Sequence, residues 1–254
     1  MGEVGRRIEG ALSRAGWTVH PVTRTEGWQA ALAADDPSPR IVAVREEALG
    51  GVLDRFSATL RDRLVLVQNG FLEPVHGDLG PVTRGLIYFT SKGDFFRVLC
   101  PSPFHGKQAA PIVDALSADG MPAETIAEPD PFLDAMIVKG IWNAVVGLPL
   151  AVHEVDLGSY LRDRREELES LVAESAGACG RRYGVEVDAA AALAKILETT
   201  GELGWVRGGK KALPWRNGAI SWFGRLHGVP TPVNDRLLRD AGYDPEVAPD
   251  RQQP

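Results

Sequence analysis

Cysteine, excess positive charge and long apolar runs are all scarce in this sequence, and each scarcity excludes a class of protein. Only two cysteines, Cys100 and Cys179, occur in 254 residues, which leaves no disulfide framework and no cysteine-based zinc cluster. We expect both to be small buried side chains in a reducing, cytoplasmic setting. The five histidines show no metal-ligand spacing, so we expect no metal site.

Charge and hydropathy argue against nucleic acid and membrane as binding partners. Acidic residues outnumber basic ones by 34 to 28, and the formal net charge is −6, which makes the chain a poor candidate for nucleic-acid binding. The first ten residues lack the apolar run of a signal peptide. The longest apolar stretch, residues 135–150, contains Lys139 and is shorter than the ~20 residues of a membrane span. We therefore expect no membrane partner and a buried core helix at this stretch.

The first half of the sequence alternates between helical and strand patterns. Residues 3–15 place apolar side chains on one stripe, which predicts an amphipathic helix. Short β-branched runs predict strands at residues 17–22, 40–44 and 64–67, with helices in the intervals. Such alternation is typical of a parallel sheet with helical crossovers. Residues 82–98 predict two further strands around a turn at residues 91–94.

The pattern changes at Pro129 and Pro131, and nearly everything after them is helical. Helices are predicted at four places, residues 132–148, 160–183, 188–202 and 217–226. We therefore predict an α/β fold in two domains, an N-terminal Rossmann-like domain over residues 1–128 and an all-α domain over residues 129–254.

Gly2 and Gly5 have the spacing of the last two glycines of a dinucleotide-binding turn, and a predicted helix follows them. Arg24 comes nineteen residues after Gly5, where an arginine suits the 2′-phosphate of NADP and an acidic residue would suit NAD. Two glycines near a frayed terminus are the alternative interpretation. The strand that normally precedes such glycines is not in this sequence, so we expect either a longer reading frame or an incomplete sheet with the first Rossmann strand missing.

Lys139 is the only ionisable residue in the apolar stretch of residues 135–150. Burial lowers the pKa of a lysine toward the range in which it exchanges protons at neutral pH. Asn143 follows four residues later, on the same helix face. Together they predict a proton donor and an amide for one small polar ligand. The alternative is a lysine at a helix rim whose ammonium reaches water.

Four segments occur in the order of a known family: GEVG at the first helix, LVLVQNG, MIVKGIWNAVVGLPL, and RNGAISWFGRLHGVPTPVNDRLL. In these segments the chain resembles the ketopantoate reductase (2-dehydropantoate 2-reductase) family. The resemblance implies a Rossmann domain, a helical domain and an active site in the cleft between them. It also implies NADPH as cofactor, a small 2-oxo acid as substrate, a place in pantothenate synthesis, and a possible homodimer.

The resemblance also implies roles for individual residues. Lys139 matches the family's catalytic lysine, and Asn143 matches a substrate-binding asparagine one turn beyond it. The family's Ser-Ser-Met segment, which helps to bind the substrate carboxylate, has no clear equivalent here, and the nearest hydroxyl pair is Thr199-Thr200, of which we take Thr200 as the candidate. The positions that match cofactor-binding residues are Gly2, Gly5, Arg24 and Asn69.

Two departures concern the substrate. The family's glutamate that holds a substrate hydroxyl is replaced by Ala212, and a second substrate asparagine is replaced by Gly147. A polar substrate that loses its hydrogen-bond partners can lose orders of magnitude in discrimination. The sequence therefore leaves three hypotheses open: a ketopantoate reductase, a reductase of a different carbonyl compound, and a dinucleotide-binding protein without catalysis.

Overall fold

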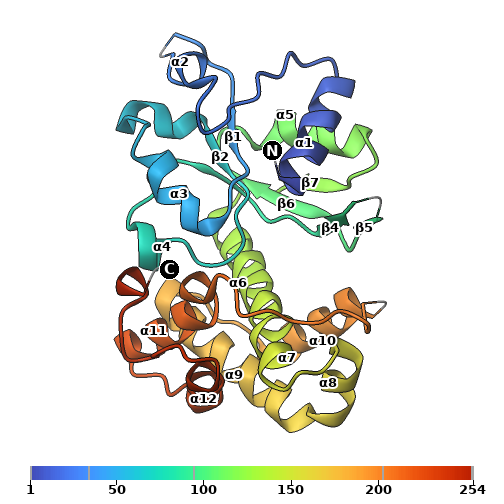
Figure 1. Cartoon of the computed structure of the whole chain (residues 1–254), viewed down its shortest axis with the longest axis vertical. Helices are drawn as coiled ribbons and strands as arrows, with labels where there is room; N and C mark the ends of the chain where they lie inside the picture. Colours follow the sequence, from blue (N-terminus) through green and yellow to red (C-terminus); the bar gives the residue numbers. More distant parts are fainter. Residues whose placement is uncertain (1, 34, 94, 202, 253–254) are drawn as a thin grey trace. The chain divides into compact units, whose positions relative to one another are not determined.

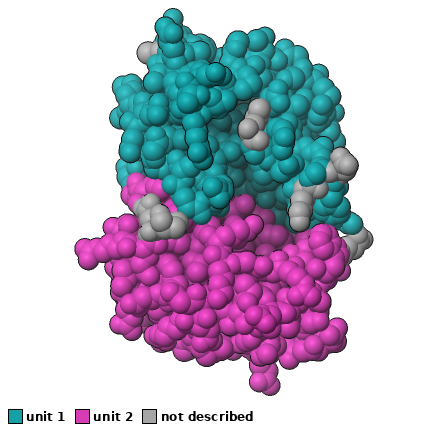
Figure 2. All heavy atoms as spheres, viewed as in Figure 1, with its two compact units in different colours: residues 1–68, 78–132 teal, residues 69–77, 133–254 magenta. Residues whose placement is uncertain are grey.

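The computed structural model describes residues 2–33, 35–93, 95–201 and 203–252. The chain divides into two compact units (Figure 2). Unit 1 comprises Met1–Gln68 and Asp78–Phe132, and unit 2 comprises Asn69–Gly77 and Leu133–Pro254. Residues 69–77 belong to unit 2 although the segments before and after them belong to unit 1. Nothing in the sequence predicts this assignment. The predicted division into folding domains at residue 128 stays a prediction.

Unit 1 is built on a five-stranded sheet in the order β1-β2-β3-β6-β7 (Figure 1). The strands are β1 (Arg40–Val42), β2 (Leu64–Leu66), β3 (Thr83–Gly85), β6 (Ser102–His105) and β7 (Ala123–Thr125). Only the β3–β6 pair is antiparallel, and the other three pairs are parallel. The predicted α/β class with a mainly parallel sheet is therefore confirmed, and β1 and β2 form where the apolar runs predict them.

Two helices share one hydrophobic cluster with this sheet. Helix α1 (Glu3–Arg14) contributes Ile8 and Leu12, and α5 (Ala109–Ala118) contributes Ile112 to the same cluster as Val65 of β2. Figure 1 shows α1 and α5 next to each other. On α1 the apolar residues recur every three or four positions, so burying one stripe leaves the arginines of the helix outside.

The predicted strand at residues 17–22 is wrong, because the chain is irregular there. In a Rossmann unit the strand after the glycine helix pairs with the strand before it, and the described residues contain no strand before α1. Without a neighbour, the backbone N–H and C=O groups of a strand have no ladder to join. Trp17 and Val19 instead pack partly buried against the cluster of α1 and α5.

One buried arginine organises the loop before β1. The Arg40 guanidinium is 9% exposed and donates hydrogen bonds to the carbonyl oxygens of Ala31 (3.1 Å), Ala33 (2.9 Å) and Asp36 (2.8 Å). The loop also holds the short helix α2 (Trp28–Ala31). A planar guanidinium with five donors can satisfy several carbonyls at once, which fixes an irregular loop without a sheet partner.

Residues 89–98 form a separate antiparallel hairpin, β4 (Phe89–Lys92) and β5 (Phe95–Val98). Two strands were predicted in this region, but Asp94 of the predicted turn lies outside the described residues. Between β1 and β2 the chain forms α3 (Glu46–Leu53) and the 3-10 turn η1 (Ala58–Arg63) rather than one continuous helix.

Unit 2 is helical, as predicted. Its helices and 3-10 turns are α4 (Glu73–His76), α7 (Leu148–Val152), α8 (Leu157–Asp163), α9 (Arg165–Tyr183), α10 (Ala189–Thr200), η2 (Leu213–Trp215), α11 (Asn217–His227), α12 (Pro232–Asp240) and η3 (Pro249–Arg251). It also receives most of α6 (Pro129–Val145). The single helix predicted over residues 160–183 is two, because the chain breaks at Arg164, and α12 was not predicted.

Helix α6 is the apolar helix expected from the sequence. Continued to Val152, it is one helical stretch of 24 residues that is apolar and long enough to cross a membrane, and 67% of its most apolar window is buried. A core helix meets the same criteria of length and composition. Its close packing depends on Gly140, where a Cβ atom would lie 2.2 Å from the ring of Phe71.

Replacing Gly140 by alanine should therefore lower stability. Phe71 is fully buried, so its ring has no free space to move into, and overpacking of this kind costs about 1–3 kcal/mol. Chemical denaturation of Gly140→Ala measures the loss. Gly51→Ala is the control, since a Cβ there meets nothing within 4 Å and should leave stability nearly unchanged. Equal effects of the two substitutions would contradict this account of the packing.

A second prediction concerns an ion-paired cluster of unit 2. Glu167 accepts hydrogen bonds from His153 (2.8 Å) and Arg236 (2.5 Å). Burial opposes ionisation of Glu167, but these two hydrogen bonds outweigh it and hold the pKa of the carboxyl below its ordinary value. A lowered pKa contributes stability above the unfolded-state value, and that contribution is lost as the pH falls through the folded-state value. The stability difference between the wild type and Glu167→Gln should thus be largest above about pH 5 and shrink below about pH 4. Thermal melts across this range test it, and a difference independent of pH would contradict it.

Candidate active site

Lys139 and Asn143 lie one turn apart on α6, and both are buried. Lys139 is 4% exposed and Asn143 is 3% exposed, so the lysine is not the water-reaching rim residue of the alternative interpretation. The Lys139 Nζ atom lies 4.0 Å from the centroid of the Trp142 ring. An aromatic face attracts a cation, most strongly away from water. The face of Trp142 is thus a direct neighbour of the Lys139 amine, a contact that the sequence does not signal.

Two buried donors beside Lys139 make no hydrogen bond within the described part of the chain. They are the indole Nε1 of Trp142 and the amide Nδ2 of Asn143. Native structures rarely leave such groups unsatisfied, since each costs about 1–3 kcal/mol. With the Lys139 ammonium, this stretch of α6 offers donors to a ligand rich in acceptor oxygens.

The segment that carries Asn69 packs onto the same helix. Phe71 lies against Gly140, the residue after Lys139, and its N–H donates to the Trp215 carbonyl at 2.7 Å. Gly70 has φ +89°, and a Cβ there would lie 2.2 Å from that carbonyl. Asn69 is half-buried and belongs to unit 2 together with Lys139. The segment that carries Asn69 thus packs against α6, the helix that carries Lys139. The predicted contact of Asn69 with the cofactor stays a prediction.

Thr200 stands apart from this arrangement. It is 1% exposed at the end of α10, and its hydroxyl donates to the Ile196 carbonyl of its own helix at 2.7 Å. This bond occupies the hydroxyl hydrogen, so only the oxygen lone pairs remain for another partner. The suggested role of Thr200 in binding a substrate carboxylate is untested and has no support from this geometry.

The two positions that lack the expected polar side chains are closely packed. Ala212 is 7% exposed, with a left-handed backbone conformation (φ 54°, ψ 32°) before η2. At Gly208 a Cβ would lie 2.0 Å from the Gly147 carbonyl oxygen, so the loop of residues 208–209 lies directly against Gly147. Neither Ala212 nor Gly147 offers a side-chain hydrogen bond to a substrate hydroxyl.

The start of α1 carries the predicted phosphate-binding residues. Gly2 is the N-cap and has no side-chain cap, so N–H groups of the first turn face outward. A Cβ at Gly2 would meet nothing within 4 Å, whereas Gly5 is buried. The Glu3 carboxylate is bound by Arg6 (2.7 Å) and Ser91 (3.3 Å), and Arg24 is exposed in the loop beyond the helix. An open helix N-terminus fits the phosphates of a dinucleotide, while the predicted contact of Arg24 with the cofactor stays a prediction.

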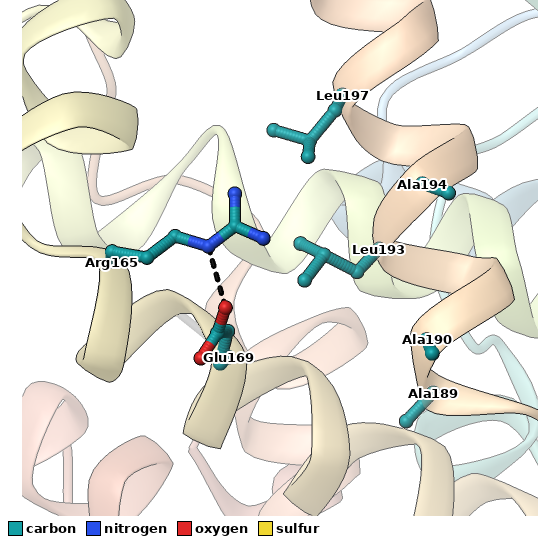
Figure 3. A pocket seen from close by; sticks show the side chains of 7 residues that line it. All are labelled: Arg165, Glu169, Ala189, Ala190, Leu193, Ala194 and Leu197. Atoms are coloured by element: carbon teal, nitrogen blue, oxygen red, sulfur yellow. Dashed lines mark hydrogen bonds and ion pairs between the residues drawn. The ribbon is translucent and has the colours of Figure 1, made fainter.

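A separate hollow of about 420 Å³ opens between α9 and α10 (Figure 3). Its walls are alanine and leucine side chains with the Arg165–Glu169 ion pair, 2.6 Å long, at one side. None of the predicted site residues lines it. Among the residues that the structure describes, no cluster of three or more His, Cys, Asp or Glu could hold a metal ion.

Several solved structures share the fold of this chain. A 2-dehydropantoate 2-reductase from Geobacter metallireducens matches with a TM-score of 0.72 at 12% identity, over 95% of this chain and 97% of that one. A ketopantoate reductase from Ralstonia eutropha matches with a TM-score of 0.67 at 19% identity, over 100% and 97%. A D-mandelate dehydrogenase, solved with NADH, matches with a TM-score of 0.62 at 17% identity, over 80% and 76%.

No protein-family model matches the chain, and no curated protein matches it. Sequence identities below 20% with nearly full-length structural matches mean that the architecture is shared while most side chains differ. The four motifs and the solved structures agree on one architecture: the chain has the fold of the ketopantoate reductases.

Proposed function

We propose that the chain is a nicotinamide-dependent reductase of a 2-oxo acid, with NADPH as its cofactor. The observation that carries the proposal is Lys139, an amine buried in an apolar helix beside two buried donors that have no hydrogen-bond partner among the described residues. A lysine is rarely buried without a reason of this kind. The shared fold supports the same assignment.

In this proposal the phosphates of the dinucleotide bind the first turn of α1 at Gly2 and Gly5. Arg24 faces the 2′-phosphate, and Asn69 faces the nicotinamide end. When bound, the reduced nicotinamide supplies a hydride for the substrate carbonyl carbon. Glu3, in the same turn, has its carboxylate bound by Arg6 and Ser91, which offsets part of its negative charge.

Lys139 supplies the proton. Its Nζ donates a hydrogen bond to the substrate carbonyl oxygen and transfers the proton as negative charge develops there. The face of the Trp142 ring lies 4.0 Å from Nζ and would help to position the group that donates the proton. Asn143 Nδ2 donates to a second substrate oxygen and fixes the orientation of the carbonyl. The neutral amine then regains a proton from solvent.

A dinucleotide-binding protein without catalysis is the second candidate, favoured by Ala212. An alanine at 7% exposure provides no hydrogen bond to the hydroxyl of ketopantoate. The same observation also fits a reductase whose substrate has no hydroxyl there. Oxidation of NADPH by any 2-oxo acid in a panel separates the two candidates.

Lys139→Met should lower turnover by about 10²–10⁴-fold, the usual contribution of a general acid, while NADPH affinity changes little. NADPH oxidation measures turnover, and quenching of protein fluorescence by NADPH measures affinity. Lys195→Met is the matched control, because Lys195 is an exposed lysine paired with Glu198 on α10. Parallel losses of affinity and turnover in Lys139→Met would show that the lysine binds cofactor or supports the fold.

Arg24→Ser should weaken NADPH binding and leave NADH binding unchanged. A hydrogen bond to a charged group contributes about 1.5–3 kcal/mol, or about a 10- to 100-fold change in the dissociation constant. Titration of both cofactors against both proteins measures the ratio. Arg162→Ser, at an exposed arginine of α8 paired with Asp163, is the control. An unchanged preference would remove Arg24 from the cofactor site without affecting the role of Lys139.

A further inference from the structure

Three positions are spaced by four in the sequence: Lys139 and Asn143 on α6, and Gly147 just beyond the end of that helix at Val145. Gly147 is the N-cap of α7, and a Cβ there would lie 3.8 Å from Nη1 of Arg216. A side chain at position 147 would therefore begin in van der Waals contact with the guanidinium of Arg216. Arg216 is half-buried and directly precedes α11.

The backbone around Arg216 is fixed from two sides. The carbonyl of its neighbour Trp215 accepts the Phe71 N–H at 2.7 Å, and Trp215 itself is fully buried. On the other side, Asn217 Nδ2 donates to Asn234 at 2.9 Å, and Asn234 donates back to the Asn217 carbonyl at 2.9 Å. The start of the arginine side chain is thus well determined, and only its long stem can move.

The named polar groups along this face are all donors. Lys139 Nζ, Trp142 Nε1 and Asn143 Nδ2 come first, and Arg216 follows beside Gly147. Lys139 and Gly147 are eight residues apart, which corresponds to about 12 Å along a helix axis. The Lys139 side chain covers part of this distance, since its Nζ reaches the ring of Trp142. A 2-oxo acid held at its carbonyl by Lys139 would thus extend its far end, not the carboxylate next to the carbonyl, toward Arg216.

We infer that Arg216 determines substrate specificity by binding a carboxylate at the far end of the substrate, so that the preferred substrate is a 2-oxo dicarboxylate. The inference rests on the proposed function, because it takes Lys139 as the group at the carbonyl. A guanidinium binds a carboxylate through two parallel hydrogen bonds, which gives both affinity and orientation. Ala212 and Gly147, which offer no acceptor to a hydroxyl, agree with a far end that carries negative charge.

The test compares 2-oxo acids with charged and uncharged far ends. NADPH oxidation is measured with 2-oxoglutarate and oxaloacetate, and with 2-oxoisovalerate and ketopantoate. We expect kcat/KM to favour the dicarboxylates by about 10- to 100-fold, the value of one charge-assisted pair. In Arg216→Gln this preference should disappear through a higher KM, while the values for the uncharged substrates stay as in the wild type. Arg216→Lys, which keeps the charge and loses the paired geometry, should lie in between.

The control is Arg225→Gln, at an exposed arginine of the same helix whose guanidinium lies over Trp222; it should change neither substrate class. Melting temperatures of all variants show whether they fold. A wild type that reduces both substrate classes equally, or an Arg216→Gln that lowers both equally, overturns the inference and leaves the proposed function standing.

A binding measurement distinguishes a failure of the carboxylate site from a failure of the proposed reductase function. Glutarate, which has two carboxylates and no carbonyl, is titrated calorimetrically into wild type and Arg216→Gln. Binding that is lost in Arg216→Gln supports the carboxylate site even where no 2-oxo acid is reduced, in which case only the reductase proposal fails. Absence of glutarate binding to the wild type, together with absence of any preference for dicarboxylates, overturns the carboxylate site.

Discussion

Lys139 places an amine at 4% exposure inside a helix whose neighbouring side chains are almost entirely apolar. Removing a charged group from water costs several kcal/mol unless other groups replace the lost hydration. The Trp142 face replaces part of it, but an aromatic ring contributes only about 0.5–2 kcal/mol. Asn143 Nδ2 and Trp142 Nε1, close by, are buried donors without an acceptor among the described residues. Burial of this kind persists where a ligand completes the hydrogen bonding, and that is the basis on which we regard this face of α6 as a site rather than as core.

Small residues bring the other segments of unit 2 to this helix. Gly140 admits the ring of Phe71, and Gly208 lies against the backbone of Gly147. In both places the absence of a Cβ, not a chemical group, positions the neighbouring segment. Glycines in this part of the chain thus affect the site indirectly. They set how closely the segments that carry Asn69 and Arg216 approach the helix that carries Lys139.

The sequence predicted elements whose stability comes from their own pattern. The apolar stripe of α1 buries one face of the helix, whereas the continuous apolar run of β2 is buried on both faces. Either pattern can be recognised from local sequence alone. Residues 17–22 have an equally good strand pattern and form no strand, because a strand also needs a neighbour that local sequence cannot supply. The same limit applies to β6, where Ser102, Pro103 and Phe104 show no strand signal and pairing with β3 and β7 decides the structure.

The candidate site likewise has residues that local sequence could predict and one that it could not. The burial of Lys139 and Asn143 followed from the composition of a single helix, so the sequence could predict it. Arg216 is separated from Gly147 by 69 positions, and only the folded chain brings its guanidinium to that glycine. The sequence alone does not mark Arg216 as part of the site, because Gly147, against which its guanidinium lies, is on a distant segment. In our proposal a glycine on one segment and an arginine on another together set the charge at the far end of the site, while Lys139 acts at the reacting centre.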